Sequence, residues 1–211
     1  MNIGILGTGE VGRTLGTGFI GLGHDVMIGS RDAQKPELQE WAKKNGGKAG
    51  TFADTATFGE VILLCTNWSG TENAIKLAGV SNFNGKLVID VTNPLSFANG
   101  VPQLAVGFSD SGGEIIQRLL PNAKVVKAWN TITAKFMTDG RFPEGNCEMF
   151  IAGNDGPSKE KVREFLTSFY WNTHDLGGIE QSRLLESFAM LWIWFGVRTG
   201  IWNHAFKLVR K

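Results

Sequence analysis

A glycine-rich hexamer near the N-terminus is the first stretch whose residue types and spacing could do chemistry. It reads Gly7-Thr-Gly9-Glu-Val-Gly12, and it lies between the apolar run Asn2–Leu6 and a helical pattern at Glu10–Leu22. In this context Gly7 permits a tight turn, Gly9 lets the backbone approach a diphosphate, and Gly12 allows close helix–strand packing. The first amides of the helix carry partial positive charge that suits the same anion. We therefore predict a dinucleotide-binding turn, with a tight turn that binds nothing as the alternative.

The residues after the second apolar run indicate which dinucleotide this turn would hold. A site for NAD usually carries a carboxylate here for the ribose hydroxyls, but this chain has Gly29-Ser-Arg-Asp after its strand. Ser30 offers a neutral donor, and Arg31 offers a planar cationic fork that suits a phosphate. Lys35 adds a second positive charge, and Asp32 is better placed to cap the following helix. We predict NADP(H), with a solvated surface role for Arg31 as the alternative.

Three polar loops follow later strands, and ligands collect at such strand ends in an open parallel sheet. They read CTNWSG (65–70), DVTNPLS (90–96) and WNTIT (129–133). Their asparagines could bind the nicotinamide amide, a ribose or a substrate carbonyl, and Trp68 could wall off the nicotinamide ring. Ordinary turn chemistry is the alternative reading. The candidate cofactor contacts in and next to these loops are Thr66, Asn67, Trp68, Asn93, Asn130 and Ala134.

The chain offers no obvious catalytic acid or base. The only tyrosine, Tyr170, has no lysine four residues later. His24 and His174 fit structural roles, and His204 is only a weak candidate for the active site. No spacing suggests a metal site, so we assign neither catalytic residues nor metal ligands. This pattern disfavours alcohol–carbonyl chemistry, in which a proton moves with the hydride. Hydride transfer to a flavin-like ring needs mainly positioning and an enclosed site.

The elements that must position these residues alternate between short apolar strands and helices. Further strands are expected at 61–65, 86–91 and 124–129, and helices at 36–44, 71–78 and 113–120. Continuous apolar strands separated by helices predict a parallel sheet covered on both faces. The fold class is therefore α/β, a Rossmann-type doubly wound parallel sheet.

A C-terminal extension is expected to follow this NADP-binding domain, with the domain at 1–130 and the extension at 131–211. Strands at 148–153 and 173–178 flank a helix at 158–169, and a long apolar helix from about 180 to 207 ends the chain. Phe188, Trp192, Phe195, Trp202 and Phe206 would share one face of that helix. Exposure of so many aromatics would leave a sticky patch, which favours a homodimer over a monomeric core helix.

Composition restricts the partners of the chain. It has 211 residues, and 21 Lys+Arg against 20 Asp+Glu give a net charge of +1, which argues against nucleic acid or an anionic membrane. The two cysteines lie far apart, and no apolar tract approaches the roughly 20 residues that span a bilayer. No signal peptide is recognisable, so we expect a cytoplasmic protein.

The stretches GILGTGEVG, MIGSRD, CTNW, KAWNTI and DLGGIEQSRLLESFAML together resemble the coenzyme F-420-dependent NADP oxidoreductases, or deazaflavin reductases. The resemblance covers nearly the whole chain. It implies that Thr8 to Val11, including Glu10, hold the pyrophosphate, that Ser30, Arg31 and Lys35 hold the 2′-phosphate, and that Trp68 lies near the nicotinamide. It also implies a homodimer. Archaeal members carry His-Thr-Ile where this chain has Asn130-Thr-Ile, and Pro-Trp where it has Asn67-Trp68. These differences leave the acceptor open.

The expected function is hydride transfer between NADP(H) and a deazaflavin or flavin-type acceptor, with coenzyme F-420 or FMN as the co-substrate. One alternative is a small imine or carbonyl reductase of the same fold, which would need an acid that the sequence does not reveal. Another is a redox sensor that binds NADP(H) without turnover.

Overall fold

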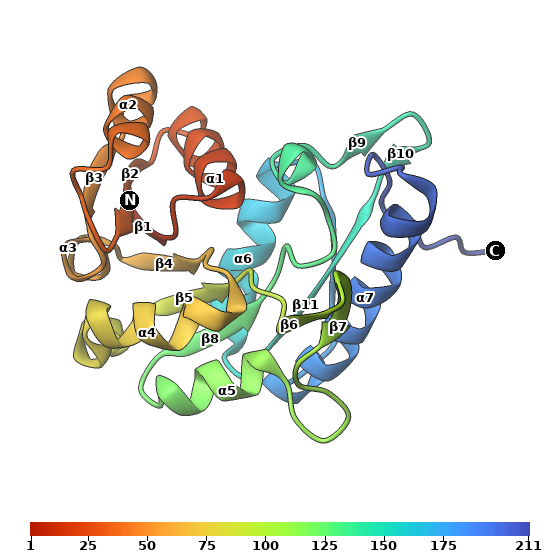
Figure 1. Ribbon diagram of the computed structural model, residues 1–211. Coiled ribbons are helices and arrows are strands. Elements are labelled where there is room, and N and C mark those ends of the chain that lie inside the picture. The colour runs from red at the N-terminus through yellow and green to blue at the C-terminus, as the bar shows by residue number, and fades with distance from the viewer.

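The computed structural model describes residues 1–211 (Figure 1). Eight strands form its main sheet. In sheet order they are β12 (Asn172–Asp175), β11 (Glu148–Gly153), β8 (Lys124–Lys127), β5 (Leu87–Asp90), β4 (Val61–Leu64), β1 (Asn2–Leu6), β2 (Asp25–Ser30) and β3 (Lys48–Thr51). Every pair is parallel except β8 with β11. The order β3-β2-β1-β4-β5 is that of the Rossmann fold, which confirms the predicted fold class.

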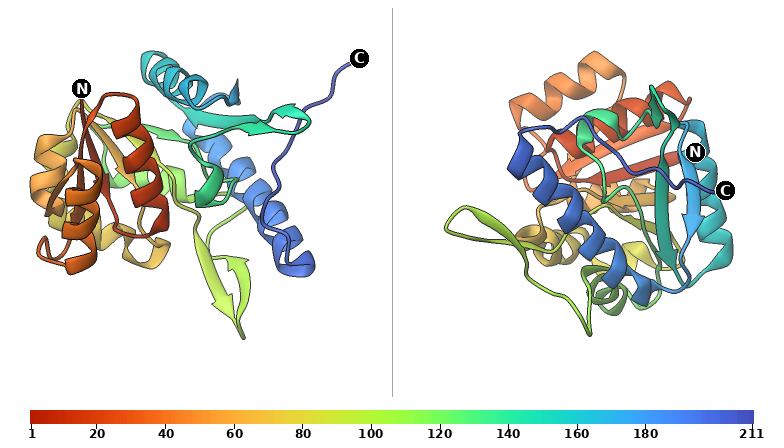
Figure 2. Two further views of the ribbon diagram at one scale, coloured as in Figure 1. Left: turned by 90° about the horizontal axis from the view of Figure 1, so that it is seen from above. Right: turned by 90° about the vertical axis from the view of Figure 1, so that its right-hand side faces the viewer.

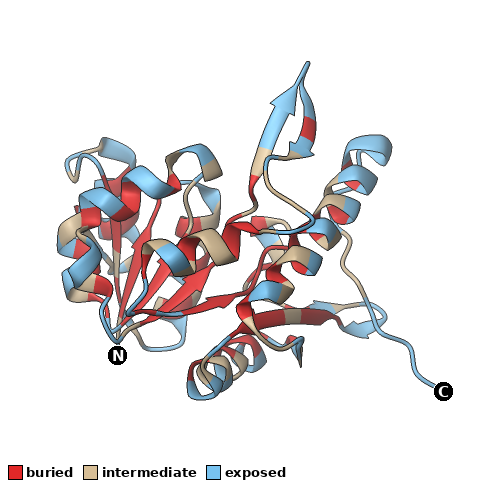
Figure 3. Cartoon of the chain, turned by 90° about the horizontal axis from the view of Figure 1, so that it is seen from below, coloured by how far each residue is buried: buried red, intermediate tan, exposed pale blue.

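Helices cover both faces of the sheet because its strands are apolar on both sides, as Figure 3 shows by their burial. One core lies under α1, α2 and α6, and a second lies under α3, α4 and α5. The bounds are α1 (Glu10–Gly21), α2 (Pro36–Asn45), α3 (Phe52–Phe58), α4 (Trp68–Ala78), α5 (Gly112–Leu119) and α6 (Gly156–Ser168), with short 3-10 turns η1 (Val80–Phe83), η2 (Ala134–Phe136) and η3 (Ile179–Gln181).

The structure contains elements that the sequence analysis did not predict. Strand β3 and helix α3 follow α2 directly, and Thr51 and Asp54 form a capping box at the start of α3. A hairpin of β6 (Leu95–Ala98) and β7 (Val101–Leu104) projects from the body of the protein (Figure 2). A smaller hairpin joins β9 (Arg141–Phe142) to β10 (Gly145–Asn146).

The last helix is shorter than predicted. Helix α7 spans Ser182–Thr199 and ends at Gly200, which adopts a left-handed conformation, so the predicted helix is confirmed but its predicted end at 207 is wrong. The chain then folds back along α7, where the ring of Phe206 stacks on Phe188 with centroids 4.0 Å apart. Two of the aromatic residues predicted to share a helix face therefore do meet, but one of them comes from the returning tail.

The C-terminal segment continues the sheet of the first 130 residues. Strand β11 pairs with β8 through Ala152 and Gly153, and β12 then forms the edge. The helices are all too short or too polar to cross a lipid bilayer.

An ion pair joins α7 to α5. The guanidinium of Arg183 donates to both carboxylate oxygens of Glu114, and Ser111 donates a further bond to that carboxylate. The Arg183 hydrogen bonds, with that of Ser111, lower the pKa of Glu114 despite the opposing effect of burial.

Because its pKa is lowered in the folded state, Glu114 stabilises the fold above its ordinary pKa of 4.5, and this contribution is lost as the pH falls below it. We expect Glu114→Gln to lower the free energy of unfolding at about pH 6, and the difference from the unmodified protein to shrink toward about pH 3. Urea unfolding at several pH values measures this difference. A difference independent of pH would contradict the assignment.

Candidate functional site

The glycine-rich turn lies at the carboxyl end of β1, next to the end of β2. The amide of Gly7 donates to the carbonyl of Gly29 at 3.1 Å, which joins the turn to the loop that carries Ser30 and Arg31. Gly7 has a φ of +129°, and a Cβ there would lie 2.3 Å from the carbonyl oxygen of Cys65. A Cβ on Gly9 would meet no atom within 4 Å, so its missing side chain leaves open space above the turn. This is the arrangement that a diphosphate needs in order to reach the backbone.

Gly12 fixes the first turn of α1 against the glycine-rich turn. A Cβ on Gly12 would lie 2.1 Å from the carbonyl oxygen of Gly7, a backbone atom that cannot move aside. We therefore expect Gly12→Ala to destabilise the fold by about 1–3 kcal/mol, the usual cost of overpacking. It should also weaken NADPH binding, because the helix start moves away from the phosphate. Thermal unfolding and NADPH titration measure the two effects, and Gly21→Ala, whose Cβ meets no atom within 4 Å, is the control.

The loop after β2 presents two cations. Arg31 is exposed and Lys35 half-buried, and neither forms an ion pair with a carboxylate. Ser30 is buried, and its hydroxyl donates to the carbonyl of Asp32, so here it shapes the turn that carries Arg31. Asp32 accepts the amide of Gln34 and does not cap α2, whose N-cap is Lys35. The predicted capping role of Asp32 is therefore wrong.

A hollow of about 530 Å³ gathers the turn, these cations and the start of the β4–α4 loop. Its lining includes Gly7, Thr8, Gly9, Ser30, Arg31, Lys35, Thr66 and Asn67. The backbone turn and the two cations therefore line the same hollow. The lining thus has the groups that an adenosine diphosphate with an added 2′-phosphate would need.

A second cavity, of about 860 Å³, adjoins the first. Both are lined by Cys65, Thr66, Asn67 and Ser69, so one elongated molecule could occupy the two. The second cavity also collects Val11, Trp68, Asn93 and Asn130. Its remaining lining is mostly apolar and includes Val91, Leu95, Phe97, Ile132 and Met137.

Two asparagines from different loops hold each other at the wall of this cavity. The side-chain amide of Asn93 donates to the backbone carbonyl of Asn130 at 2.8 Å, and the side-chain amide of Asn130 donates to the side-chain oxygen of Asn93 at 3.1 Å. Asn130 also donates to the carbonyl of Leu185 in α7 at 3.0 Å. Trp129, directly before it, is fully buried with a φ of +58°, a strained conformation for a non-glycine residue. This kink turns the chain toward the cavity after β8.

The second cavity contains no side chain that could donate a proton near neutral pH. None of its lining residues is an aspartate, glutamate, histidine, lysine or tyrosine. Its one thiol belongs to Cys65, and burial, with a smaller effect of Asp90, raises the pKa of that thiol far above its ordinary value. The lining can therefore enclose and orient a ring, but it has no titrating group to offer.

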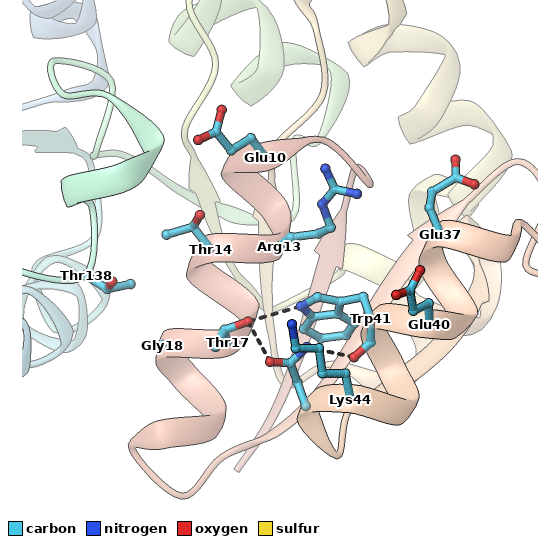
Figure 4. A pocket seen from close by; sticks show the side chains of 11 residues that line it. Glu10, Arg13, Thr14, Thr17, Gly18, Glu37, Glu40, Trp41, Lys44 and Thr138 are labelled. Atoms are coloured by element: carbon cyan, nitrogen blue, oxygen red, sulfur yellow. Dashed lines mark hydrogen bonds between the residues drawn. The ribbon is translucent and has the colours of Figure 1, made fainter. Parts of the chain in front are cut away.

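Three of the predicted site residues lie outside both cavities. Gly12 packs against the backbone of Gly7, and Ala134 is buried in η2. Glu10 lies at one end of a separate groove between α1 and α2 (Figure 4). In that groove Trp41 donates to Thr17, away from the carboxyl ends of the strands.

Sequence analysis missed several residues of the second cavity. Leu95, Ser96, Phe97 and Ala105 come from the β6–β7 hairpin or its edge. The dipeptide Asn99-Gly100 between two short apolar runs is a hairpin signal that would have revealed it, and both residues have the positive φ of a type I′ turn.

Comparison with known proteins supports the resemblance seen in the sequence. The family model described as NADP oxidoreductase coenzyme F420-dependent matches residues 2–94. The crystal structure of a candidate F420-dependent NADP-reductase from Arthrobacter sp. FB24 is 38% identical, with a TM-score of 0.93 and full coverage of both chains. The F420-dependent NADP reductase of Methanothermobacter marburgensis is 28% identical over 226 residues, which cover 99% of this chain and 98% of that protein.

A further relative is much longer than this chain. The metalloreductase STEAP3 of Rattus norvegicus is 27% identical over 194 residues, 89% of this chain but only 36% of that protein. The chain thus spans about a third of the length of this relative. The match to the Arthrobacter protein extends over both whole chains, and on that basis this chain belongs to the family of coenzyme F420-dependent NADP oxidoreductases.

Proposed function

We propose that this protein is an NADPH-dependent oxidoreductase whose acceptor is a deazaflavin or a flavin. The observation that carries the proposal is the junction of the two cavities along Cys65–Ser69. A phosphate-binding turn with unpaired cations lies on one side, and a mostly apolar cavity without titrating groups lies on the other. When bound, NADPH supplies a hydride from C4 of its nicotinamide ring.

The residues of the chain would act by binding and orientation. The turn at Thr8–Val11 would hold the pyrophosphate, and Arg31 and Lys35, with Ser30, would hold the 2′-phosphate. Trp68 would cover the nicotinamide, and Asn67, Asn93 and Asn130 would fix its amide or the acceptor. The apolar walls exclude water and keep two flat rings in contact. An imine or carbonyl reductase would need a proton donor, which this cavity lacks.

Stopped-flow mixing of the protein with NADPH and either coenzyme F420 or FMN tests the proposal. We expect the absorbance of NADPH to fall in step with reduction of one of the two acceptors. Binding of NADPH without oxidation across a broad acceptor panel would contradict it and would favour a redox sensor.

We also propose a cytoplasmic homodimer. Helix α7 leaves Leu184, Leu191, Trp194 and Phe195 exposed, and Phe108, beyond the β6–β7 hairpin, is fully exposed. Apolar exposure on this scale is typical of an interaction surface. Both cysteines are free thiols, as a reducing compartment would leave them. Sedimentation analysis is expected to give the mass of two chains, and the mass of one chain would contradict the dimer.

A further inference from the structure

Three charged side chains form a fully buried cluster behind the second cavity. Lys127 ends β8, Asp90 ends β5, and Glu186 comes from α7, and no side chain of the three is more than 1% exposed. The ammonium of Lys127 lies 2.7 Å from a carboxylate oxygen of Asp90 and 2.8 Å from one of Glu186. The cluster therefore joins two central strands to the C-terminal helix.

Each member of the cluster is fully hydrogen-bonded. The third bond of the ammonium goes to the carbonyl of Thr92 at 2.8 Å. Glu186 accepts the amides of Gly112 and Gly113, at 2.9 and 3.1 Å, from the start of α5. These amides offset the excess negative charge of two carboxylates on one ammonium.

The cluster holds the backbone of the cavity wall. The second oxygen of Asp90 accepts both the amide and the hydroxyl of Thr92, at 2.9 and 2.7 Å, and Thr92 lines the second cavity. Thr92 is therefore held from three directions, by its amide, its hydroxyl and its carbonyl. Asn93, the next residue, is part of the asparagine pair described above.

Two consecutive residues of α7 thus reach both loops of the cavity wall. The carbonyl of Leu185 accepts from Asn130, and the carboxylate of Glu186 fixes Lys127, which holds Thr92. If α7 moves, the Asn130 loop loses its bond to Leu185, and Lys127, which holds Thr92, loses its contact with Glu186. The half of the site formed by β1 and β2 has no bond to this cluster.

Stability alone does not account for such a cluster, because apolar side chains of similar volume usually stabilise a core as well or better. The charged groups also form directional hydrogen bonds, which fix the positions of individual loop atoms such as the carbonyl oxygen of Thr92. We infer that Lys127 and Glu186 are positioning residues that set the acceptor half of the cleft from helix α7. This inference rests on the proposed function for its kinetic consequence.

Glu186→Gln tests the inference, because it removes one charge and keeps the size of the side chain. With FMN or coenzyme F420 as the probe, we expect kcat/KM for the acceptor to fall about 10- to 100-fold, as a misplaced site would predict. The Kd for NADPH should stay within about two-fold, because the phosphate-binding groups lie elsewhere. Equal losses in acceptor kcat/KM and NADPH affinity, or no loss in either, would overturn the inference.

Glu114→Gln is the matched control. Glu114 also bridges α5 and α7, through Arg183, but it has no bond to the cavity wall. We expect this variant to keep the acceptor kinetics of the unmodified protein. If it loses as much as Glu186→Gln, the effect comes from the α5–α7 contact and the inference fails.

A second readout separates this inference from the proposed function. The backbone amide resonances of Thr92 and Asn93 should shift in ¹⁵N-labelled Glu186→Gln and stay in place in Glu114→Gln, without any acceptor. Unchanged resonances would overturn the positioning role, whereas failure of every acceptor would overturn only the proposed function. If Glu186→Gln does not fold, the variant with Asp90→Asn, Lys127→Met and Glu186→Gln together removes all the charges. It should fold and still lose acceptor kcat/KM, and normal kinetics in it would count against the inference.

Discussion

Replacing Arg31 by alanine should weaken NADPH binding by about 2 kcal/mol, roughly 30-fold, and change NADH binding little. The guanidinium is exposed at the end of β2 and forms no ion pair, so no carboxylate competes with a ligand for it. A charge-assisted, two-pronged bond to the 2′-phosphate would be lost, and NADH has no such phosphate. Fluorescence titration with each dinucleotide measures the two affinities.

Arg198→Ala is the control for net charge. Arg198 is exposed on α7, far along the chain from the phosphate site, and its removal changes the charge by the same amount. We expect it to affect NADPH and NADH equally and weakly. Equal losses for both dinucleotides in Arg31→Ala would show that Arg31 contributes only general charge, and the assignment of NADP(H) to this loop would lose its basis.

The geometry of the glycine-rich turn could be predicted from the sequence because it depends on neighbouring residues. The glycines at 7, 9 and 12 act through backbone geometry within one strand–turn–helix unit, and each lies where that unit requires it. Arg31 and Lys35, in the loop after β2, line the same hollow as that turn, as expected for the loop at the end of the neighbouring strand. Strand ends also meet at one edge of a parallel sheet, so the loops with Asn67, Asn93 and Asn130 were expected to converge, and they do.

The terminal helix shows where periodicity fails. Aromatic residues continue at helical spacing past Thr199, but Gly200 takes a left-handed conformation with a φ of +73° and ends the helix. The tail then returns with its own aromatics against the same face, and the indole of Trp202 lies 2.6 Å from where a Cβ on Gly196 would be. A continuous helix and a segment that folds back along the helix can both place aromatic residues on one face. The spacing of the aromatic residues alone therefore does not distinguish the two arrangements.

The buried cluster of Asp90, Lys127 and Glu186 could not be predicted from the sequence because its members are distant in the chain. Asp90 and Lys127 are 37 residues apart. Each lies at the end of an apolar strand, where a charged residue usually indicates that the strand has reached the protein surface. Glu186 reads as a polar interruption before an apolar stretch of helix. The three charges come together only because the strand order places β5 beside β8 and because α7 packs against α5 and β11.

Lys127→Met should lower the free energy of unfolding by about 3–5 kcal/mol, the usual cost of breaking a buried ion pair. Burial alone lowers the pKa of Lys127, but Asp90 and Glu186 outweigh burial and raise it, so the amine carries a charge at neutral pH. Methionine fills a similar volume but leaves two buried carboxylates without a cation between them. Urea unfolding, followed by tryptophan fluorescence and far-UV circular dichroism, measures the loss.

The same substitution at Lys86 separates this effect from the general loss of a lysine. Lys86 is half-buried at the start of β5 and donates to the carbonyl of Ala56 at 2.7 Å, with no carboxylate in its contacts. Lys86→Met should therefore cost about 1 kcal/mol, the value of one hydrogen bond. If Lys127→Met costs no more than this, the two carboxylates do not depend on the ammonium. If the added changes Asp90→Asn and Glu186→Gln recover much of the loss, the cost comes from the unpaired charges and not from the packing of the lysine side chain.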